Sequence, residues 1–133
     1  MKIVSPFLLF TSLIISSVAC AAQSSDIQTI KKSLKPWQPM EVTNTDGNIS
    51  VILNAAQVTP EIYNAVVMAG VCPTIWTKDA PESYMKNVKE LQILNKFKAM
   101  GYVLEKPLAT CNEMGKETDD RAKTIMLSQT HLY

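Results

Sequence analysis

The stretch from Thr59 to Cys72, "TPEIYNAVVMAGVC", decides the fold that we expect of this chain. Thr59 is a good N-cap residue, Pro60 suits the first helical position because its missing N–H is not needed there, and Glu61 lies near the positive end of the helix dipole. The residues that follow are almost all apolar, and a helix that is apolar nearly all round is buried. We therefore predict a central core helix over residues 60–71 that ends at Cys72.

The residues before this helix predict a β-hairpin. The sequence "MEVTNTDGNISVILN", residues 40–54, contains the tight-turn pair Asp46-Gly47 with β-branched residues on both sides. We expect its strands near 40–44 and 49–53. Further towards the N-terminus, a short amphipathic helix is expected to begin with Ser25 as its N-cap and to end at Pro36.

The segment "YMKNVKELQILNKFKAMGYVLEKP", residues 84–107, allows two interpretations. Its apolar residues recur every three or four positions, which favours a helix over 82–98. It also contains the compact apolar run "LQIL" and the strand-like "GYVLE" at 101–105. A lone hairpin is marginally stable and needs sheet partners, so we favour strands near 89–94 and 102–105 over the helix.

Two short helices are expected near the C-terminus. Pro107 suits the start of the first and Gly115 its end, with Cys111 on the inward face, and Thr118 is placed to cap the second. The predicted fold is a small α+β domain. Its antiparallel sheet comprises the hairpin 40–53 and strands near 89–94 and 102–105, packed by the buried helix 60–71 and the short C-terminal helices. The alternative is a mostly α domain with one hairpin.

The N-terminal residues are typical of a secretory signal peptide. Lys2 is followed by an apolar stretch and then by small residues, so we predict a signal peptide over residues 1–21. The apolar stretch 7–15 is shorter than the roughly 20 residues that a membrane-spanning helix needs. Small residues allow cleavage before Ala22 or before Gln23. The remaining chain, 22–133, is long enough for one domain.

A bacterial lipoprotein is the second interpretation of this region. Cys20 would then become the lipidated first residue, although Ser17 stands where such sites usually have Leu, Val or Ile. Both signal-peptidase frames instead remove Cys20. In either case we expect an exported protein, periplasmic or secreted, with a membrane attachment only if Cys20 is lipidated.

The remaining cysteines are expected to pair. Without Cys20, Cys72 and Cys111 form an even pair in an oxidising setting, which predicts a disulfide. The chain-entropy model gives such a bridge about 4 kcal/mol of stabilisation. A redox site would place a second cysteine three positions after Cys72, where this chain has Ile75. The expected domain is therefore small and stapled by one disulfide.

Few side chains point to catalysis. The only histidine, His131, lies three residues from the end, where we expect an exposed tail. We therefore predict no metal, no cofactor, no catalytic residues and no enzymatic activity. The charges are balanced, with Lys+Arg 13 against Asp+Glu 12. A nucleic-acid partner is not expected, because it would require a basic surface.

The segment from Pro73 to Pro81 is predicted to be a loop with an exposed Trp76, and it is the place where we expect a partner to bind. It follows Cys72 directly and carries Pro73, Trp76, Lys78 and Asp79. The function that we expect is a small exported, non-catalytic binding module, an inhibitor or immunity-type protein that acts on another exported protein. The alternative is an envelope stress chaperone or structural factor, with an enzyme of unknown class as a third, minor interpretation.

Overall fold

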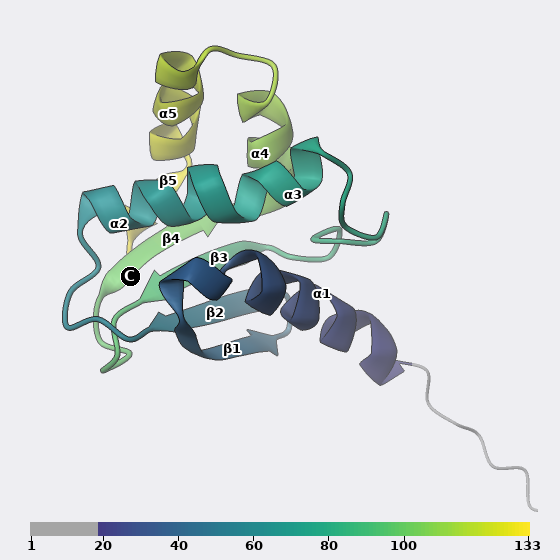
Figure 1. Cartoon of the computed structure of the whole chain (residues 1–133), viewed down its shortest axis with the longest axis vertical. Helices are drawn as coiled ribbons and strands as arrows, with labels where there is room; N and C mark the ends of the chain where they lie inside the picture. Colours follow the sequence, from purple (N-terminus) through teal and green to yellow (C-terminus); the bar gives the residue numbers. More distant parts are fainter. Residues whose placement is uncertain (1–18) are drawn as a thin grey trace, which may run out of the picture.

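The computed structural model describes residues 19–133, with side chains from Ser25 onwards (Figure 1). The predicted signal peptide lies almost entirely outside these residues. The described chain folds as a small α+β domain, as predicted, and its five strands exclude the mostly α alternative. In chain order the elements are α1 (Ala19–Ser33), η1 (Lys35–Trp37), β1 (Pro39–Thr45), β2 (Asn48–Leu53), α2 (Pro60–Ala65), η2 (Val66–Val71), α3 (Cys72–Trp76), β3 (Glu90–Leu94), β4 (Gly101–Glu105), α4 (Pro107–Met114), α5 (Asp119–Ser128) and β5 (Thr130–Leu132).

The sheet has the strand order β1-β2-β3-β4-β5 and is mixed rather than antiparallel throughout. Strands β1 and β2, β3 and β4, and β4 and β5 pair antiparallel, whereas β2 and β3 pair parallel. The expectation of an antiparallel sheet was wrong at this one pair. The helix that follows β2 crosses over the sheet and returns the chain in the same direction, as a parallel pair requires.

The predicted strands are confirmed in both halves of the sheet. The backbone at Asp46 and Gly47 has φ angles of 52° and 89°, as a type I′ hairpin turn requires. Gly47 is needed for a second reason, because a Cβ there would lie 2.7 Å from the carbonyl oxygen of Asn87. The ambiguous segment forms β3 and β4, which decides between strand and helix in favour of the strands.

The predicted core helix is present and longer than expected. Segments α2, η2 and α3 form one continuous helix, so Cys72 lies within it rather than at its end. Thr59 caps it as predicted, because its Oγ1 accepts a hydrogen bond from the backbone N–H of Ile62 at 3.2 Å. The helix is not buried all round, since Ala65 and Ala69 are exposed on one side.

The middle of this helix, η2, is a π-helix. The backbone N–H of Cys72 bonds to the carbonyl of Val67, five residues earlier. Gly70 is buried here, and a Cβ at that position would lie 2.4 Å from Cδ2 of Leu34 and 3.0 Å from Cζ3 of Trp37. The glycine therefore allows α1 and η1 to pack closely against η2.

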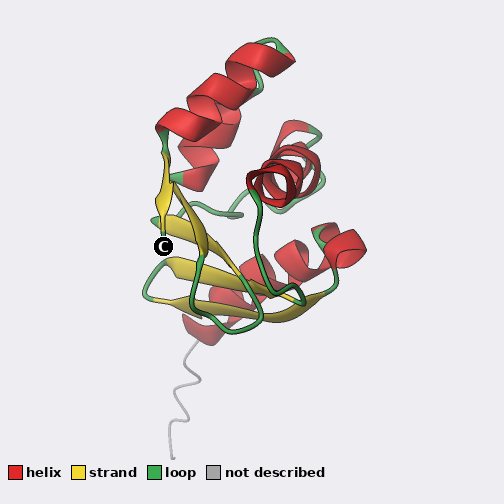
Figure 2. Cartoon of the chain, turned by 90° about the vertical axis from the view of Figure 1, so that its left-hand side faces the viewer, coloured by secondary structure: helices red, strands yellow, loops and turns green. Residues whose placement is uncertain are grey.

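The helices lie on one side of the sheet. Figure 2 shows α1 and the long helix on the same face, and their buried side chains join one core with alternate residues of the strands, such as Val51, Leu91 and Leu104. Among the described residues no helix covers the other face, on which Ser50 bonds to Gln92 across β2 and β3.

The two ends of the described chain differ from the prediction. Helix α1 passes through Ser25 and begins at Ala19, since the alanine-rich residues before Ser25 favour a helix. His131 is exposed as predicted, but it lies in β5, where it pairs with Val103 of β4, rather than in an irregular tail. Helices α4 and α5 are present as predicted, although the side chain of Thr118 makes no capping hydrogen bond to α5.

Candidate functional site

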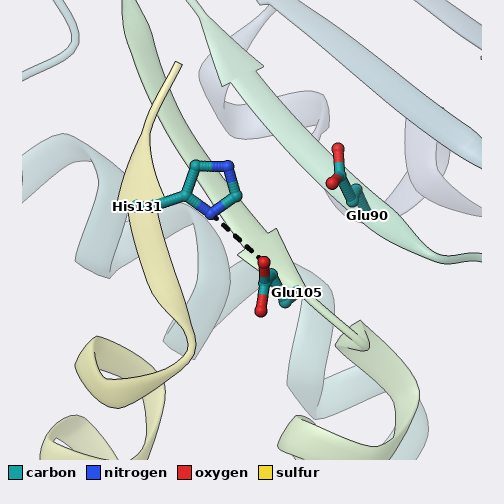
Figure 3. A group of neighbouring side chains, drawn as sticks. All are labelled: Glu90, Glu105 and His131. Carbon is teal, nitrogen blue, oxygen red and sulfur yellow. Dashed lines mark ion pairs between the residues drawn. The ribbon is translucent and has the colours of Figure 1, made fainter.

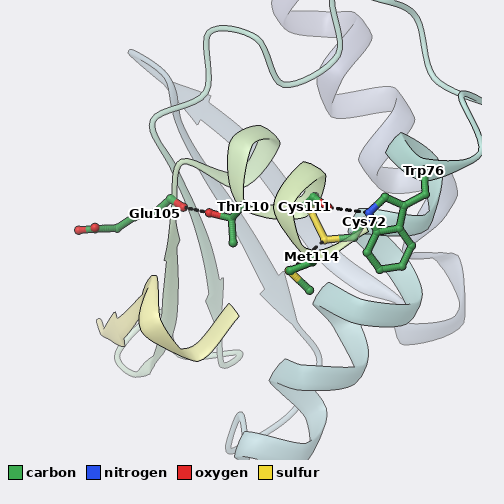
Figure 4. The surroundings of a disulfide bond; sticks show 6 residues. All are labelled: Cys72, Trp76, Glu105, Thr110, Cys111 and Met114. Atoms are coloured by element: carbon green, nitrogen blue, oxygen red, sulfur yellow. Dashed lines mark hydrogen bonds between the residues drawn. A yellow bond between two sulfur atoms is a disulfide. The ribbon is translucent and has the colours of Figure 1, made fainter. Parts of the chain in front are cut away.

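The predicted disulfide is present and joins two helices. Cys72 and Cys111, which are 39 residues apart, are both fully buried and bonded at an S–S distance of 2.03 Å. Figure 4 shows the bridge between α3 and α4. The Sδ atom of Met114 lies 3.9 Å from Sγ of Cys72. Because the Cys72 sulfur is bonded to that of Cys111 and carries no hydrogen, this is a packing contact and not a hydrogen bond. The bridge fixes α3 and the residues directly after it.

Trp76 is held against α4 by a hydrogen bond. Its Nε1–H donates to the carbonyl oxygen of Cys111 at 2.6 Å (Figure 4). Its ring lies so close to Gly115 that a Cβ there would be 2.7 Å from Nε1. The side chain remains 38% exposed. Pro73 and Trp76 are therefore part of α3, not of an exposed loop as we expected, and the loop begins after them.

The loop that follows α3 is well ordered by local contacts. The hydroxyl of Thr77 lies 2.9 Å from the carbonyl oxygen of Pro73 and 2.8 Å from Oδ2 of Asp79. Lys78 adopts the left-handed conformation with a φ of 57°, which turns the chain out of the helix. Lys78 and Asp79 are both exposed, and the contact with Thr77 holds the side chain of Asp79.

A first hollow of about 520 Å³ lies between this loop, α3 and α4. This volume is within the range of about 300–1,000 Å³ that small-ligand sites occupy. Its half-buried walls are mostly apolar, and its exposed rim carries two lysines and a glutamate. The lining residues are Thr74, Ile75, Lys78, Ala80, Pro81, Glu82, Tyr84, Lys86 and Leu108.

A second hollow of about 400 Å³ lies beside the first and shares Thr74 with it. Its other lining residues come from α1 and the loop, and they are polar or charged: Thr29, Lys32, Ser33 and Asp79. We call the two hollows together the groove. Of the partner-binding residues predicted from sequence, Lys78 lines the first hollow and Asp79 the second, whereas Pro73 and Trp76 line neither.

Tyr84 is a buried wall residue of the groove. Its hydroxyl lies near the side chain of Ser33 but forms no well-directed hydrogen bond within the described part of the chain. Burial, and secondarily the negative charge of Asp26, raises the pKa of Tyr84 well above its usual value. Burial also raises the pKa of Asp26, opposed by a hydrogen bond of 3.3 Å from the backbone N–H of Met85 to its Oδ1. Tyr84 in the wall of the groove and the neighbouring Asp26 thus form a buried polar cluster.

A separate cluster on the helix-free face has the side chains that could hold a metal ion. Glu90, Glu105 and His131 come from β3, β4 and β5, and their ligand atoms all lie within 4.8 Å of one another. Figure 3 shows the three side chains, with the ion pair of 3.6 Å between Nδ1 of His131 and Oε1 of Glu105. No local sequence pattern indicates this cluster, because its members are far apart in the chain.

The comparisons with known proteins found no relative. No protein-family model, no curated protein and no solved structure matches this chain. None of the helices between residues 19 and 133 is long and apolar enough to cross a membrane. By its fold and its disulfide, the chain belongs to the class of small, disulfide-stapled α+β domains.

Proposed function

We propose that this protein is a small exported, non-catalytic binding module that uses the groove to hold another exported protein, in the manner of an inhibitor or immunity protein. The loop after α3 carries Lys78 and Asp79 and lies between the two hollows. The observation that carries this proposal is the rigid attachment of this loop to the rest of the domain. The Cys72–Cys111 bridge, the Trp76 hydrogen bond and the Thr77 contacts all act within a few residues of Lys78 and Asp79.

Rigid attachment favours tight binding because little conformational entropy is lost when the partner docks. The chemistry of the groove suggests which partner segment fits. The apolar walls of the first hollow, such as Ile75 and Leu108, suit an apolar side chain of the partner. Lys78 and Lys86 on the rim suit an acidic residue beside it, and such charges also speed up association.

The same lining residues support a non-catalytic role. They include no histidine and no free cysteine, the side chains that most often act as general base or nucleophile. The signal peptide predicted from the sequence and the disulfide support export. The alternative of a stress chaperone is favoured by one observation, a group of exposed apolar side chains near the end of β5: Met100, Leu132 and Tyr133.

The test is site-specific cross-linking with the oxidised, exported chain. A photoreactive amino acid in place of Lys78 should capture one partner at a ratio of one to one from an envelope or culture extract of the producing organism. The same amino acid in place of Lys123, which is exposed on α5, should capture none. Capture of many proteins, or equal capture from both positions, would contradict the proposal.

A charge-reversal pair adds the matched control. Lys78→Glu with Lys86→Glu should abolish the captured complex. Lys116→Glu with Lys123→Glu makes the same change of charge outside the groove and should leave the complex intact. A chaperone should instead bind a hydrophobic dye at low pH and lose little activity in either double variant.

A further inference from the structure

We propose that Glu90, Glu105 and His131 form a binding site for a divalent transition-metal ion of the zinc class on the helix-free face of the sheet. The site lies on the other side of the sheet from the groove, and it does not depend on the proposed function.

The register of the strands brings the three side chains together. Glu90 and Glu105 are directly opposite each other in the β3–β4 pair. His131 is opposite Val103, two residues before Glu105, and therefore projects from the same face. Ligands bonded to zinc at about 2.0–2.1 Å in a tetrahedron lie about 3.4 Å apart. The ligand atoms here lie within 4.8 Å of one another, so small side-chain rotations bring them to that spacing.

The charges at this position give a second, independent argument. Two carboxylates directly opposite on neighbouring strands repel each other and destabilise the pair. Within the described residues neither Glu90 nor Glu105 has a lysine or arginine at ion-pair distance, and the neighbour at that distance from Glu105 is the imidazole of His131. A divalent cation would neutralise both carboxylates, which explains why the sheet tolerates this pair.

The backbone that carries His131 is fixed on both sides. The hydroxyl of Thr130 donates to the carbonyl of Met126 at 2.7 Å, so its single hydrogen is used, and it accepts the hydrogen bond of 2.6 Å from the Tyr63 hydroxyl. On the other side, the backbone N–H of Tyr133 donates to the carbonyl of Gly101 at 3.1 Å. The backbone that carries this ligand therefore needs little reordering when an ion binds, and only the side chain has to be ordered.

The ligand set selects the class of ion. Ca²⁺ and Mg²⁺ prefer oxygen ligands alone, whereas a neutral imidazole favours Zn²⁺, Ni²⁺ and Cu²⁺. Three protein ligands would leave one position of a tetrahedral zinc ion open to water or to a side chain of a partner. The ion would also connect three adjacent strands, including the short edge strand β5, and would stabilise the folded state by mass action.

The test is calorimetric titration of the tag-free, oxidised protein with ZnCl₂. We expect one zinc ion per chain and a rise of the unfolding temperature that depends on zinc concentration. His131→Ala should abolish both effects, and Glu90→Gln or Glu105→Gln should weaken binding by at least about tenfold. Glu61→Gln and Glu82→Gln, the same change at exposed positions outside the cluster, should bind zinc like the wild type.

Circular dichroism and the thiol count establish that each variant is folded and oxidised. The proposal is overturned if the wild type binds no zinc, if His131→Ala binds zinc unchanged, or if CaCl₂ binds as tightly as ZnCl₂. A Co²⁺ titration gives an optical check, because tetrahedral cobalt coordinated by these ligands should absorb visible light and the His131→Ala protein should not.

Discussion

At the scale of single residues, Gly70 decides how closely two helices approach. In an ordinary helix a glycine-to-alanine change stabilises by up to about 1 kcal/mol through helix propensity. Here the added Cβ would lie 2.4 Å from Cδ2 of Leu34, which is fully buried, and 3.0 Å from Cζ3 of Trp37, so core side chains must shift to admit it. The steric cost, typically about 1–3 kcal/mol for an overpacked core, is therefore larger than the gain from helix propensity.

We expect Gly70→Ala to lower the free energy of unfolding by about 1–2 kcal/mol, because the two close contacts put the steric cost near 2–3 kcal/mol and helix propensity returns about 1 kcal/mol. Urea denaturation measures it. Ala69→Ser, a change at the neighbouring exposed position, should shift the midpoint little. A midpoint for Gly70→Ala equal to or above that of the wild type would show that Leu34 and Trp37 do not pack against η2 as described.

Asp26 gives the protein an unusual response to pH. Its pKa is raised by burial, so the folded state binds its proton more tightly than the unfolded state, whose aspartate has a pKa of about 3.9. At pH values between the ordinary and the raised pKa, the folded state therefore binds more protons than the unfolded state. The contribution of Asp26 to the free energy of unfolding therefore falls as pH rises through that window, and it is recovered on acidification.

Replacing Asp26 by asparagine should remove this dependence. The amide side chain of Asp26→Asn would keep an oxygen that can accept the hydrogen bond from Met85, but it would not ionise. We expect the variant to be more stable than the wild type at pH 7, with the difference shrinking as the pH falls through the raised pKa of Asp26 towards its ordinary value of about 3.9. Urea denaturation over this pH range measures it. Glu82→Gln removes a charge at an exposed site and should leave the pH profile unchanged.

At the scale of elements, the disulfide attaches α4 and α5 to the long helix. Helix α4 presents Cys111 and Met114 to the core, and α5 presents Ala122 and Met126. We expect Cys72→Ser or Cys111→Ser to lower the free energy of unfolding by about 2–5 kcal/mol, as is usual for a small exported domain. Amide exchange should become faster in α4 and α5 before it does in β2 and β3.

A catalytic role for the cysteines predicts a different result. The native exported protein would then contain free thiols that react quickly with an alkylating reagent, and substitution would change stability little. Alkylation without reductant, followed by mass measurement, decides between the two. Modification of both cysteines in the folded wild type would contradict the buried bridge.

Local signals in the sequence predicted most of the elements. Asp46-Gly47 specifies the hairpin because few other pairs adopt two positive φ angles, and Thr59-Pro60 specifies the start of the long helix for similarly local reasons. The strands β3 and β4 were predicted by a less local argument, the need of the hairpin for partners.

Features that depend on distant contacts were not predicted. No sequence pattern within either strand indicates that β2 and β3 pair parallel. Strand β5 has only three residues and exists because β4 and Tyr63 supply its hydrogen bonds. The groove was found only in part, since Lys78 and Asp79 belong to the predicted segment, whereas Thr29 and Lys32 reach it from α1.

At the scale of the whole molecule, the one-sided arrangement of helices gives two independent surfaces. The groove lies in the helix layer, whereas Glu90, Glu105 and His131 lie on the helix-free face. A substitution on one surface is therefore expected to leave the other intact. The metal experiment and the partner experiment each serve as a folding control for the other.

The proposed export would decide whether the disulfide forms at all, because cytosolic thiols are kept reduced. If signal peptidase cleaves before Ala22 or Gln23, Cys20 is lost and both remaining cysteines are in the bridge. We expect the intact mass of the exported protein to match one of these two ends, with no free thiol. The same chain expressed without residues 1–21 in a reducing cytosol should instead carry two reduced cysteines.

Replacing Cys20 by serine separates signal-peptidase cleavage from lipidation. Serine is also small, so the peptidase still finds acceptable residues before Ala22 or Gln23 and the exported Cys20→Ser protein should have the same mass as the wild type. A lipoprotein would behave differently, because lipid attachment requires the cysteine thiol. Its wild type would carry a diacylglyceryl group and fractionate with membranes, and Cys20→Ser would accumulate as the unprocessed chain. That outcome would leave the folded domain unchanged but would attach it to a membrane surface, where its groove would meet only partners at that membrane.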